Sequence, residues 1–295
     1  MSKNPIFTGA GCAIVTPMNA DGSVNYDLFR EFIEFQIENG TDAIIACGTT
    51  GESPTLDDAE HIAVIKAAVD QVKGRIPVIA GTGSNDTAYS IHLSTEARAL
   101  GADALLLVTP YYNKTSQRGL IASYNKVANE AKMPCILYNV PSRTGVDIKP
   151  ATVFELAKNP YIIGLKQANA SLSSVAEIAA GCDIDIYSGN DNEIVAMLAL
   201  GAKGVISVLS NVAPREAHDI CAKWFEGDVI ASRDLQLKYL ELANAMFTDV
   251  NPIPVKEALN QMGWNMGDVR LPLYGMDEPA KQALHAVLAK YNLLK

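Results

Sequence analysis

The chain of 295 residues is long enough for two ordinary domains, or for one α/β barrel with an appendage. A composition of 48% hydrophobic and 19% charged residues is typical of a globular protein with a sizeable core. The net charge of −9 argues against a nucleic-acid partner or an anionic membrane surface. The sequence shows neither a bilayer-spanning apolar run nor a secretory signal, so we expect a cytoplasmic protein.

The cysteines and histidines give no sign of a metal centre. Five cysteines are spread along the chain without a CxxC pair, and the four histidines lack metal-ligand spacing. Cys12, Cys47 and Cys135 stand inside apolar runs, which is typical of small core residues in a reducing compartment. We therefore predict no metal and no cofactor.

One unit recurs along most of the chain: an apolar run, a polar loop with Gly, Thr or Asn, and a longer segment with helical period. The apolar runs predict eight strands, at residues 12–16, 43–47, 78–81, 104–108, 135–138, 162–166, 184–188 and 204–208. The segments between them predict helices, at residues 27–38, 57–72, 87–100, 117–131, 151–157, 172–179, 192–200 and 215–226. Thr55 and Asp58 predict a capping box at the second helix.

Eight such units indicate an α/β protein with a closed TIM (β/α)8 barrel. An open doubly wound sheet is disfavoured, because residues 17–22 after the first strand do not form a glycine-rich phosphate turn. From residue 228 the pattern changes to three helical stretches, at residues 230–247, 254–262 and 278–291. We predict a catalytic barrel over residues 1–227 and a small C-terminal helical domain over residues 228–295.

A lysine ends the predicted sixth strand, in the run Ile-Ile-Gly-Leu-Lys-Gln-Ala at residues 162–168. A buried ammonium is costly unless it is paired or neutral. Lys166 therefore either extends past the strand into solvent, or is an amine that dry surroundings keep reactive. In the second case it could bond to a substrate carbonyl as a Schiff base.

In such a barrel, reactive groups gather at the carboxyl ends of the strands. Those positions hold one lysine, one arginine and several hydroxyl groups, but no carboxylate cluster for a divalent metal and no serine or cysteine with a histidine base. An iminium on a lysine can act as an electron sink for carbon–carbon bond chemistry, hydroxyl groups can relay protons, and an arginine can hold a carboxylate. Each residue also has an ordinary structural explanation, so the hypothesis depends on their agreement on one face.

Several ordered motifs carry a resemblance over nearly the whole chain. They are Gly-Thr-Thr-Gly-Glu-Ser at residues 48–53, Thr-Pro-Tyr-Tyr-Asn at 109–113, Tyr-Asn-Val-Pro-Ser-Arg-Thr-Gly at 138–145, Gly-Leu-Lys at 164–166, Ser-Gly-Asn-Asp at 188–191, Gly-Val-Ile-Ser at 204–207 and Asn-Pro-Ile-Pro-Val-Lys at 251–256. In these motifs the chain resembles the dihydrodipicolinate synthase family of pyruvate-dependent class I aldolases.

The resemblance implies a lyase that condenses pyruvate with L-aspartate 4-semialdehyde in lysine and diaminopimelate synthesis. Lys166 would form the Schiff base with pyruvate. Tyr138 would be the main proton donor and acceptor, in a relay with Thr49 and with Tyr112 from a neighbouring subunit. The family is typically a homotetramer made of two tight dimers.

The resemblance also implies substrate contacts. Thr50 and its neighbouring amides would bind the pyruvate carboxylate, and Arg143 would bind the carboxylate of the semialdehyde. Gly189 and Ile206 would contribute backbone carbonyls near the keto acid. Gln167 departs from the acidic residue often found after the lysine, which leaves this chemistry unchanged.

Two other functions stay open at this point. One is a retro-aldol lyase acting on N-acetylneuraminate or a 2-keto-3-deoxy sugar acid, and the other is a non-catalytic sensor of a keto or amino acid. Neuraminate lyases carry a serine at the position of Thr49 and no arginine at that of Arg143. These two residues therefore favour the synthase.

Family members that lysine inhibits bind it at the dimer interface. Four residues match that allosteric site: Ser53, His61, Asn85 and Tyr111. Three depart from it: Pro54, Asp58 and Tyr89. Tyr89 replaces a glutamate that pairs with the ammonium of the ligand, and one lost charged hydrogen bond costs about 1.5–3 kcal/mol. We expect lysine inhibition to be weak or absent.

Overall fold

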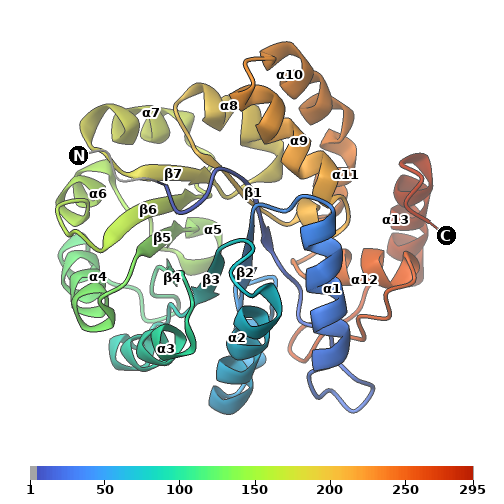
Figure 1. The fold of residues 1–295 in the computed structure, drawn as a ribbon, viewed down its shortest axis with the longest axis horizontal. Coiled ribbons are helices and arrows are strands. Elements are labelled where there is room, and N and C mark those ends of the chain that lie inside the picture. Colours follow the sequence, from blue (N-terminus) through green and yellow to red (C-terminus); the bar gives the residue numbers. More distant parts are fainter. Residues whose placement is uncertain (1–4, 295) are drawn as a thin grey trace.

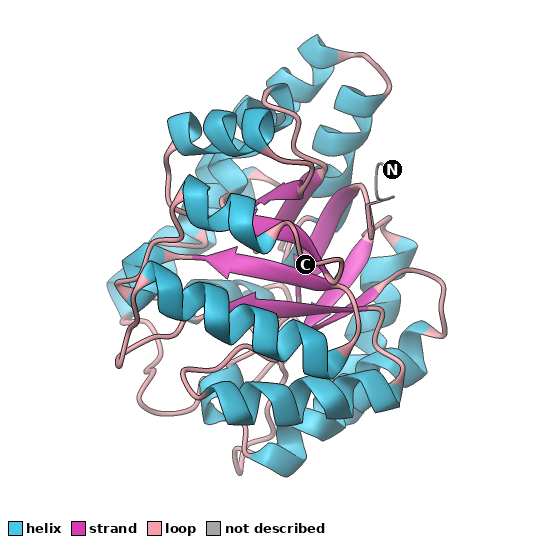
Figure 2. Ribbon diagram, turned by 90° about the vertical axis from the view of Figure 1, so that its left-hand side faces the viewer, coloured by secondary structure: helices cyan, strands magenta, loops and turns pink. Residues whose placement is uncertain are grey.

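The computed structural model describes residues 5–294, and in this range eight parallel strands close into a barrel. Each strand pairs with the next along the chain, and β8 pairs with β1. Helices surround the strands in Figure 1, and the view from the side in Figure 2 shows the strands enclosed by them. The predicted TIM barrel is confirmed. The strands are β1 (Gly9–Ala13), β2 (Ala43–Ala46), β3 (Val78–Gly81), β4 (Ala104–Val108), β5 (Cys135–Asn139), β6 (Ile162–Gln167), β7 (Asp185–Ser188) and β8 (Gly204–Ser207).

The predicted helices are present, with three differences. The stretch 192–200 divides into a 3-10 turn and α8, the stretch 230–247 divides into α10 and α11, and α5 was not predicted. No helix in the described range is both long and apolar enough to cross a membrane. The helices are α1 (Tyr26–Glu38), α2 (Asp58–Val72), α3 (Thr87–Leu100), α4 (Gln117–Ala131), α5 (Pro141–Thr144), α6 (Pro150–Leu156), α7 (Leu172–Gly181), α8 (Ile194–Ala199), α9 (Pro214–Phe225), α10 (Val229–Lys238), α11 (Leu240–Ala245), α12 (Ile253–Gln261) and α13 (Glu278–Lys290), with 3-10 helices η1 (Ser53–Thr55), η2 (Asp191–Glu193) and η3 (Leu209–Asn211).

The strands are apolar on both faces because the barrel has two cores. Successive side chains of a strand point to opposite sides. On β4, Leu105 and Leu107 belong to the core between the barrel and the helices, whereas Ala104 and Leu106 belong to the interior of the barrel. A strand buried on both sides reads as a continuous apolar run, which is the pattern that the sequence shows.

The capping box of α2 does not use the predicted pair. Asp57 accepts a hydrogen bond from the backbone N–H of Glu60 (2.8 Å), and Glu60 accepts one from the backbone N–H of Asp57 (3.3 Å). The prediction of Thr55 and Asp58 is wrong, because Thr55 ends η1 and its hydroxyl donates to the carbonyl of Glu52 (3.1 Å). The helix therefore begins at Asp58, with an aspartate in the favoured capping position before it.

The C-terminal helices pack on the barrel. The ring of Trp264, just after α12, lies edge-on to Phe32 of α1, with centroids 5.0 Å apart, and 4.9 Å from Phe35. The backbone N–H of Met18 donates to the carbonyl of Met266 (2.9 Å). Figure 1 shows α12 and α13 on the side of α1. The predicted domain boundary after residue 227 stays a prediction.

A partly buried ion pair stands at the amino end of the barrel. The Asp42 carboxylate accepts a hydrogen bond from the backbone N–H of Ala10 in β1 (2.7 Å), and lies 2.9 Å from Nδ1 of His218 in α9. The hydrogen bond with Asp42 raises the pKa of His218 above its ordinary value of 6.5, because it favours the charged imidazolium. The neighbouring Asp219 raises the pKa further, and Arg215 opposes it.

This pair predicts a pH-dependent contribution to stability. Because the pKa of His218 is raised in the folded state, its contribution is complete below 6.5 and disappears as the pH rises through the folded-state value. We expect His218→Gln to reduce the free energy of unfolding more at about pH 5.5 than at about pH 9, measured by urea denaturation. In an Asp42→Asn background the pH dependence of this difference should shrink, and an unchanged difference would contradict the assignment.

Candidate active site

Lys166 and Tyr138 lie side by side at the carboxyl ends of β6 and β5. The strand register pairs them directly, and Nζ of Lys166 stands over the ring of Tyr138, 4.3 Å from its centroid. Both are buried, with 5% and 7% of their surface exposed. Lys166 therefore does not extend into solvent, and its amine lies against the electron-rich face of the phenol ring.

A register shift produces this pairing. Cys135 pairs with Ile162, but the next residue of β5 pairs with Gly164, so Ile163 is an extra residue in β6. Consistent with this bulge, Ile162 and Leu165 both pack into the outer core although they are three residues apart. Bulges turn side chains beside active sites in many proteins. Here the extra residue aligns Lys166 with Tyr138.

A cavity of about 200 Å³ opens beside the Lys166 amine. Six of the eight residues predicted for catalysis or substrate binding line it: Thr49, Thr50, Tyr138, Arg143, Lys166 and Gly189. They come from the carboxyl ends of β5 and β6 and from the segments that follow β2, β5 and β7, as expected for a site at the carboxyl end of a barrel.

The other two predicted residues lie elsewhere. Tyr112, in the loop after β4, is 92% exposed and does not line the cavity. Ile206 of β8 is fully buried in the interior of the barrel, in the cluster that also contains Tyr138. A single chain therefore does not bring Tyr112 to the Lys166 amine.

Thr49 and Thr50 stand on a tight loop after β2. Cys47 has a positive φ of 55°, and its carbonyl passes so close to Gly81 that a Cβ atom there would lie 2.2 Å from the carbonyl oxygen. Only glycine permits this approach. The chain thereby folds back at once and directs the two threonines toward the cavity.

Asn251 connects two sides of the cavity. Its Nδ2 donates to Oγ1 of Thr50 (3.0 Å), and its backbone carbonyl accepts a hydrogen bond from Nη2 of Arg143 in α5 (3.0 Å). Asn251 and Phe247 both line the cavity, although neither is among the predicted site residues. Asn251 begins the motif at residues 251–256, which could have indicated a role. Phe247 lies beyond the strands and has no such signal.

A buried carboxyl group lies behind the cavity. Asp191, after β7, accepts hydrogen bonds from the backbone N–H groups of Val208 and Leu209 (3.0 Å each). Burial raises the pKa of Asp191, while these bonds and the charge of Lys166 act in the opposite direction. Within residues 5–294, no three His, Cys, Asp or Glu side chains are grouped so that they could hold a metal ion.

A second cavity of about 220 Å³ adjoins the first and shares Thr49, Tyr138 and Arg143 with it. Its outer part is lined by Ser53, Pro54 and Tyr111. Two of the four residues matched to an allosteric lysine site, Ser53 and Tyr111, are thus brought together here.

The other two matched residues do not line this cavity. His61 is buried, and its Nε2 lies 2.8 Å from the carbonyl oxygen of Gly81. Burial lowers the pKa of His61, which favours the neutral ring. The carbonyl of Asn85 accepts a hydrogen bond from the side chain of Asn113 (2.9 Å).

Two of the residues that depart from the allosteric pattern interact with each other. Asp58 pairs with Nε2 of His92 (3.0 Å) and also accepts a hydrogen bond from Tyr89. Burial, followed by the Asp58 carboxylate, raises the pKa of Tyr89. The Tyr89 hydroxyl therefore points to Asp58, and it carries no charge with which to attract an ammonium ligand.

Comparison with known proteins identifies the family of this chain. The sequence profile of the Dihydrodipicolinate synthetase family matches residues 6–291. A protein of Lachnoclostridium phytofermentans named 4-hydroxy-tetrahydrodipicolinate synthase is 53% identical over 292 residues, which cover 98% of this chain and 99% of that protein.

Solved structures of dihydrodipicolinate synthases are similar over the whole fold. The enzyme from Aquifex aeolicus has a TM-score of 0.96 and 44% identity, and the match covers 98% of this chain and 100% of that one. The chloride-inhibited enzyme from Acinetobacter baumannii, solved in complex with pyruvate, has a TM-score of 0.95 and 42% identity over 97% of this chain and 99% of its own. This chain therefore belongs to the dihydrodipicolinate synthase family, in the class I aldolase superfamily.

Proposed function

We propose that this protein is a 4-hydroxy-tetrahydrodipicolinate synthase, which condenses pyruvate with L-aspartate 4-semialdehyde in lysine and diaminopimelate biosynthesis. The observation that carries the proposal is the buried amine of Lys166, held beside Tyr138 in a cavity that also contains Arg143. The relative from Lachnoclostridium phytofermentans, which bears this name, matches almost the whole chain.

Lys166 is the nucleophile in this proposal. Its neutral amine adds to the ketone carbon of pyruvate and water leaves, which gives an iminium. The iminium draws electrons from the adjacent methyl group, so that a proton departs and an enamine forms. The enamine carbon attacks the aldehyde carbon of the semialdehyde. The amino group of the semialdehyde then adds to the iminium carbon, closes the ring and releases the Lys166 amine.

Tyr138 and Thr49 supply the proton transfers. The phenol of Tyr138 stands next to Nζ of Lys166, and Thr49 lines the same cavity. Hydroxyl groups so placed can donate the proton with which the carbinolamine hydroxyl leaves as water, and can later protonate the alkoxide formed at the aldehyde carbon. Tyr112 completes the relay from a second copy of the chain, and its exposure of 92% leaves it accessible to that copy.

The two carboxylates bind at different places. The Thr50 hydroxyl and the adjacent backbone N–H groups receive the carboxylate of pyruvate, and the backbone carbonyls of Gly189 and Ile206 lie near the keto acid. Arg143, fixed by the carbonyl of Asn251, holds the carboxylate of the semialdehyde through two parallel hydrogen bonds.

The assembly and location belong to the same proposal. We propose a homotetramer of two dimers, a cytoplasmic location, and a chain divided into a barrel over residues 1–227 and a helical domain over residues 228–295. The five free cysteines, four of them buried, suit a reducing compartment.

Trapping of the Schiff base tests the nucleophile. We expect borohydride to reduce an iminium when pyruvate is present, so that the protein gains the mass of the reduced pyruvyl group on the peptide containing Lys166. Mass spectrometry of the intact and digested protein measures this. Lys166→Arg should abolish both the label and the turnover. Labelled protein without any turnover would indicate a sensor, and an unlabelled Lys166 would refute the proposal.

The role of Arg143 predicts a selective defect. Loss of one charged, bidentate contact of about 1.5–3 kcal/mol should lower kcat/KM for the semialdehyde roughly 10- to 100-fold in Arg143→Ala. Borohydride trapping with pyruvate should remain. Arg143→Lys should stay impaired, because an ammonium does not reproduce the two parallel bonds. Arg118→Ala, an exposed arginine of α4, is the control. An equal fall in kcat/KM for pyruvate and for the semialdehyde would argue against this role of Arg143.

Lysine should inhibit weakly or not at all. A neutral Tyr89 bonded to Asp58 offers a lysine ammonium less than a glutamate would. Steady-state rates measured with increasing L-lysine should therefore stay nearly constant. Tyr89→Glu should increase any inhibition, while strong inhibition of the unchanged protein at low lysine would contradict the expectation.

A further inference from the structure

A buried polar network joins the loop of Thr49 and Thr50 to the C-terminal segment. Nζ of Lys256 in α12 donates to Oε1 of Glu52 at 2.8 Å, and the two side chains are 2% and 0% exposed. Nζ also donates to the carbonyl of Asp268 (2.9 Å). The other oxygen of Glu52 accepts a hydrogen bond from the backbone N–H of Arg270 (2.9 Å). Both carboxylate oxygens of Glu52 are therefore held by residues of the last third of the chain.

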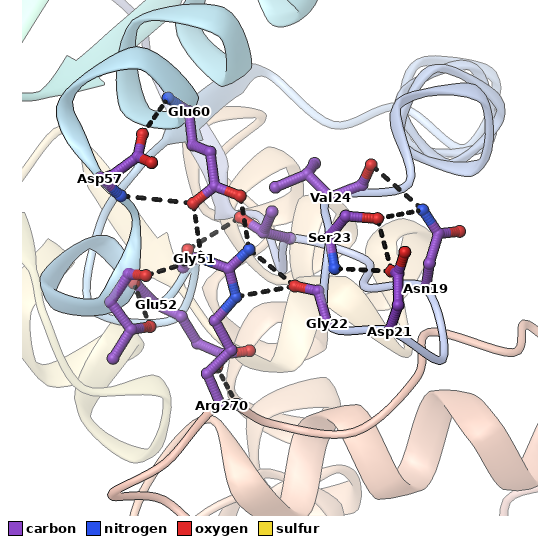
Figure 3. A network of polar contacts seen from close by, with 12 residues as sticks. Asn19, Asp21, Gly22, Ser23, Val24, Gly51, Glu52, Asp57, Glu60 and Arg270 are labelled. Carbon is purple, nitrogen blue, oxygen red and sulfur yellow. Dashed lines mark hydrogen bonds and ion pairs between the residues drawn. The ribbon is translucent and has the colours of Figure 1, made fainter.

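The side chain of Arg270 extends the network to the first helices. Its guanidinium makes two parallel bonds of 2.6 Å with Glu60, the residue of the α2 capping box. It also donates to the backbone carbonyls of Gly22 (2.7 Å) and Thr55 (2.6 Å). Figure 3 shows Arg270 reaching from the C-terminal segment between Glu60 and Gly22, with Glu52 beside it. The carboxylates of Glu52 and Glu60 thus each face a cation, Lys256 and Arg270 respectively.

Glu52 is rigidly connected to the two threonines. It follows Thr50 after a single residue, Gly51, and its backbone N–H donates to the carbonyl of Thr49 (3.1 Å). Its φ of 57° lies in the left-handed region, which is unfavourable for a residue with a side chain. Such a conformation persists only where the surroundings impose it. The contacts of Lys256 and Arg270 with the carboxylate provide that constraint.

We propose that Glu52 and Lys256 are positioning residues for the reaction: their buried ion pair fixes the loop that presents the hydroxyls of Thr49 and Thr50 to the keto acid. Asn251 holds Thr50 directly, on the same C-terminal segment and five residues before Lys256. The segment 251–270 thus holds the loop at two points. Asn251 bonds to Thr50 in the cavity, and Lys256 and the backbone of Arg270 bond to Glu52. The proposal rests on the roles proposed above for the two threonines.

The deciding variant removes both charges. A buried pair replaced by neutral groups of similar size often leaves stability intact, whereas a single charge left unpaired is strongly destabilising. We expect Lys256→Met to unfold at a lower temperature and Glu52→Gln/Lys256→Met to recover most of that loss. Pyruvate KM should nevertheless stay raised at least about tenfold in the double variant, since a methionine cannot donate a hydrogen bond to the loop.

A double-mutant cycle separates positioning from stability. In a Thr50→Val background, the pair of substitutions at residues 52 and 256 should change pyruvate KM much less than in the unchanged protein, because the hydroxyl that they position is gone. Asp42→Asn, at the opposite end of the barrel, is the matched control, and it should lower the unfolding temperature with normal kcat and KM. Circular dichroism at the assay temperature establishes that each variant is folded.

The kinetics of the double variant decide whether the ion pair positions the loop. A folded double variant with normal pyruvate KM and kcat would overturn the proposal, as would full additivity with Thr50→Val. Arg270→Lys is a second test. It keeps the backbone N–H that donates to Glu52, so it should raise pyruvate KM less than Lys256→Met does. Borohydride trapping of the unchanged protein tests the Schiff base independently. A successful trap with normal double-variant kinetics would reject only the positioning role.

Discussion

The alignment of β6 against β5 is the constraint that brings Lys166 and Tyr138 together at one end of the barrel. Side chains alternate between the two faces of a strand, so a shift of one residue would turn Lys166 out of the barrel. The extra residue at Ile163 absorbs such a shift, and it leaves Lys166 opposite Tyr138. A closed barrel makes this alignment permanent, because each strand is held on both sides by its neighbours. The backbone alone therefore places the Lys166 side chain next to the Tyr138 side chain.

Two buried lysines show how surroundings determine chemistry. Lys256 has a carboxylate partner and a backbone acceptor, and its amine donates a hydrogen bond to each. Burial nevertheless lowers the pKa of Lys256, with Glu52 acting against that change. Lys166 instead faces an aromatic ring and a cavity. The surroundings of Lys256 thus hold its amine in a structural network, whereas the surroundings of Lys166 place its amine beside an open cavity, where the proposed reaction needs it.

The barrel was predictable from the sequence because the patterns that indicate its strands and helices are local. Eight apolar runs separated by helical periods need no knowledge of distant contacts, and the strand at residues 78–81 occurs at its predicted position. The cavity residues were also predictable, since strand ends in a parallel barrel share one rim. The bulge at Ile163 was not, because nothing distinguishes an extra isoleucine in an apolar run. The capping box failed for a similar reason: Thr55 and Asp57 are both good caps, and only η1 decides between them.

The contacts of the C-terminal helices were beyond sequence reasoning. Asn251 and Lys256 meet residues 201 and 204 positions earlier in the chain, and no local pattern encodes such a distance. Their importance also bears on synthesis of the chain by the ribosome. While the barrel strands emerge, Glu52 still lacks the cation that it requires in the interior. The Glu52 carboxylate therefore gains both of its partners only after all eight strands have been synthesised, so the final arrangement of the loop of Thr49 and Thr50 depends on residues that follow the barrel in the chain.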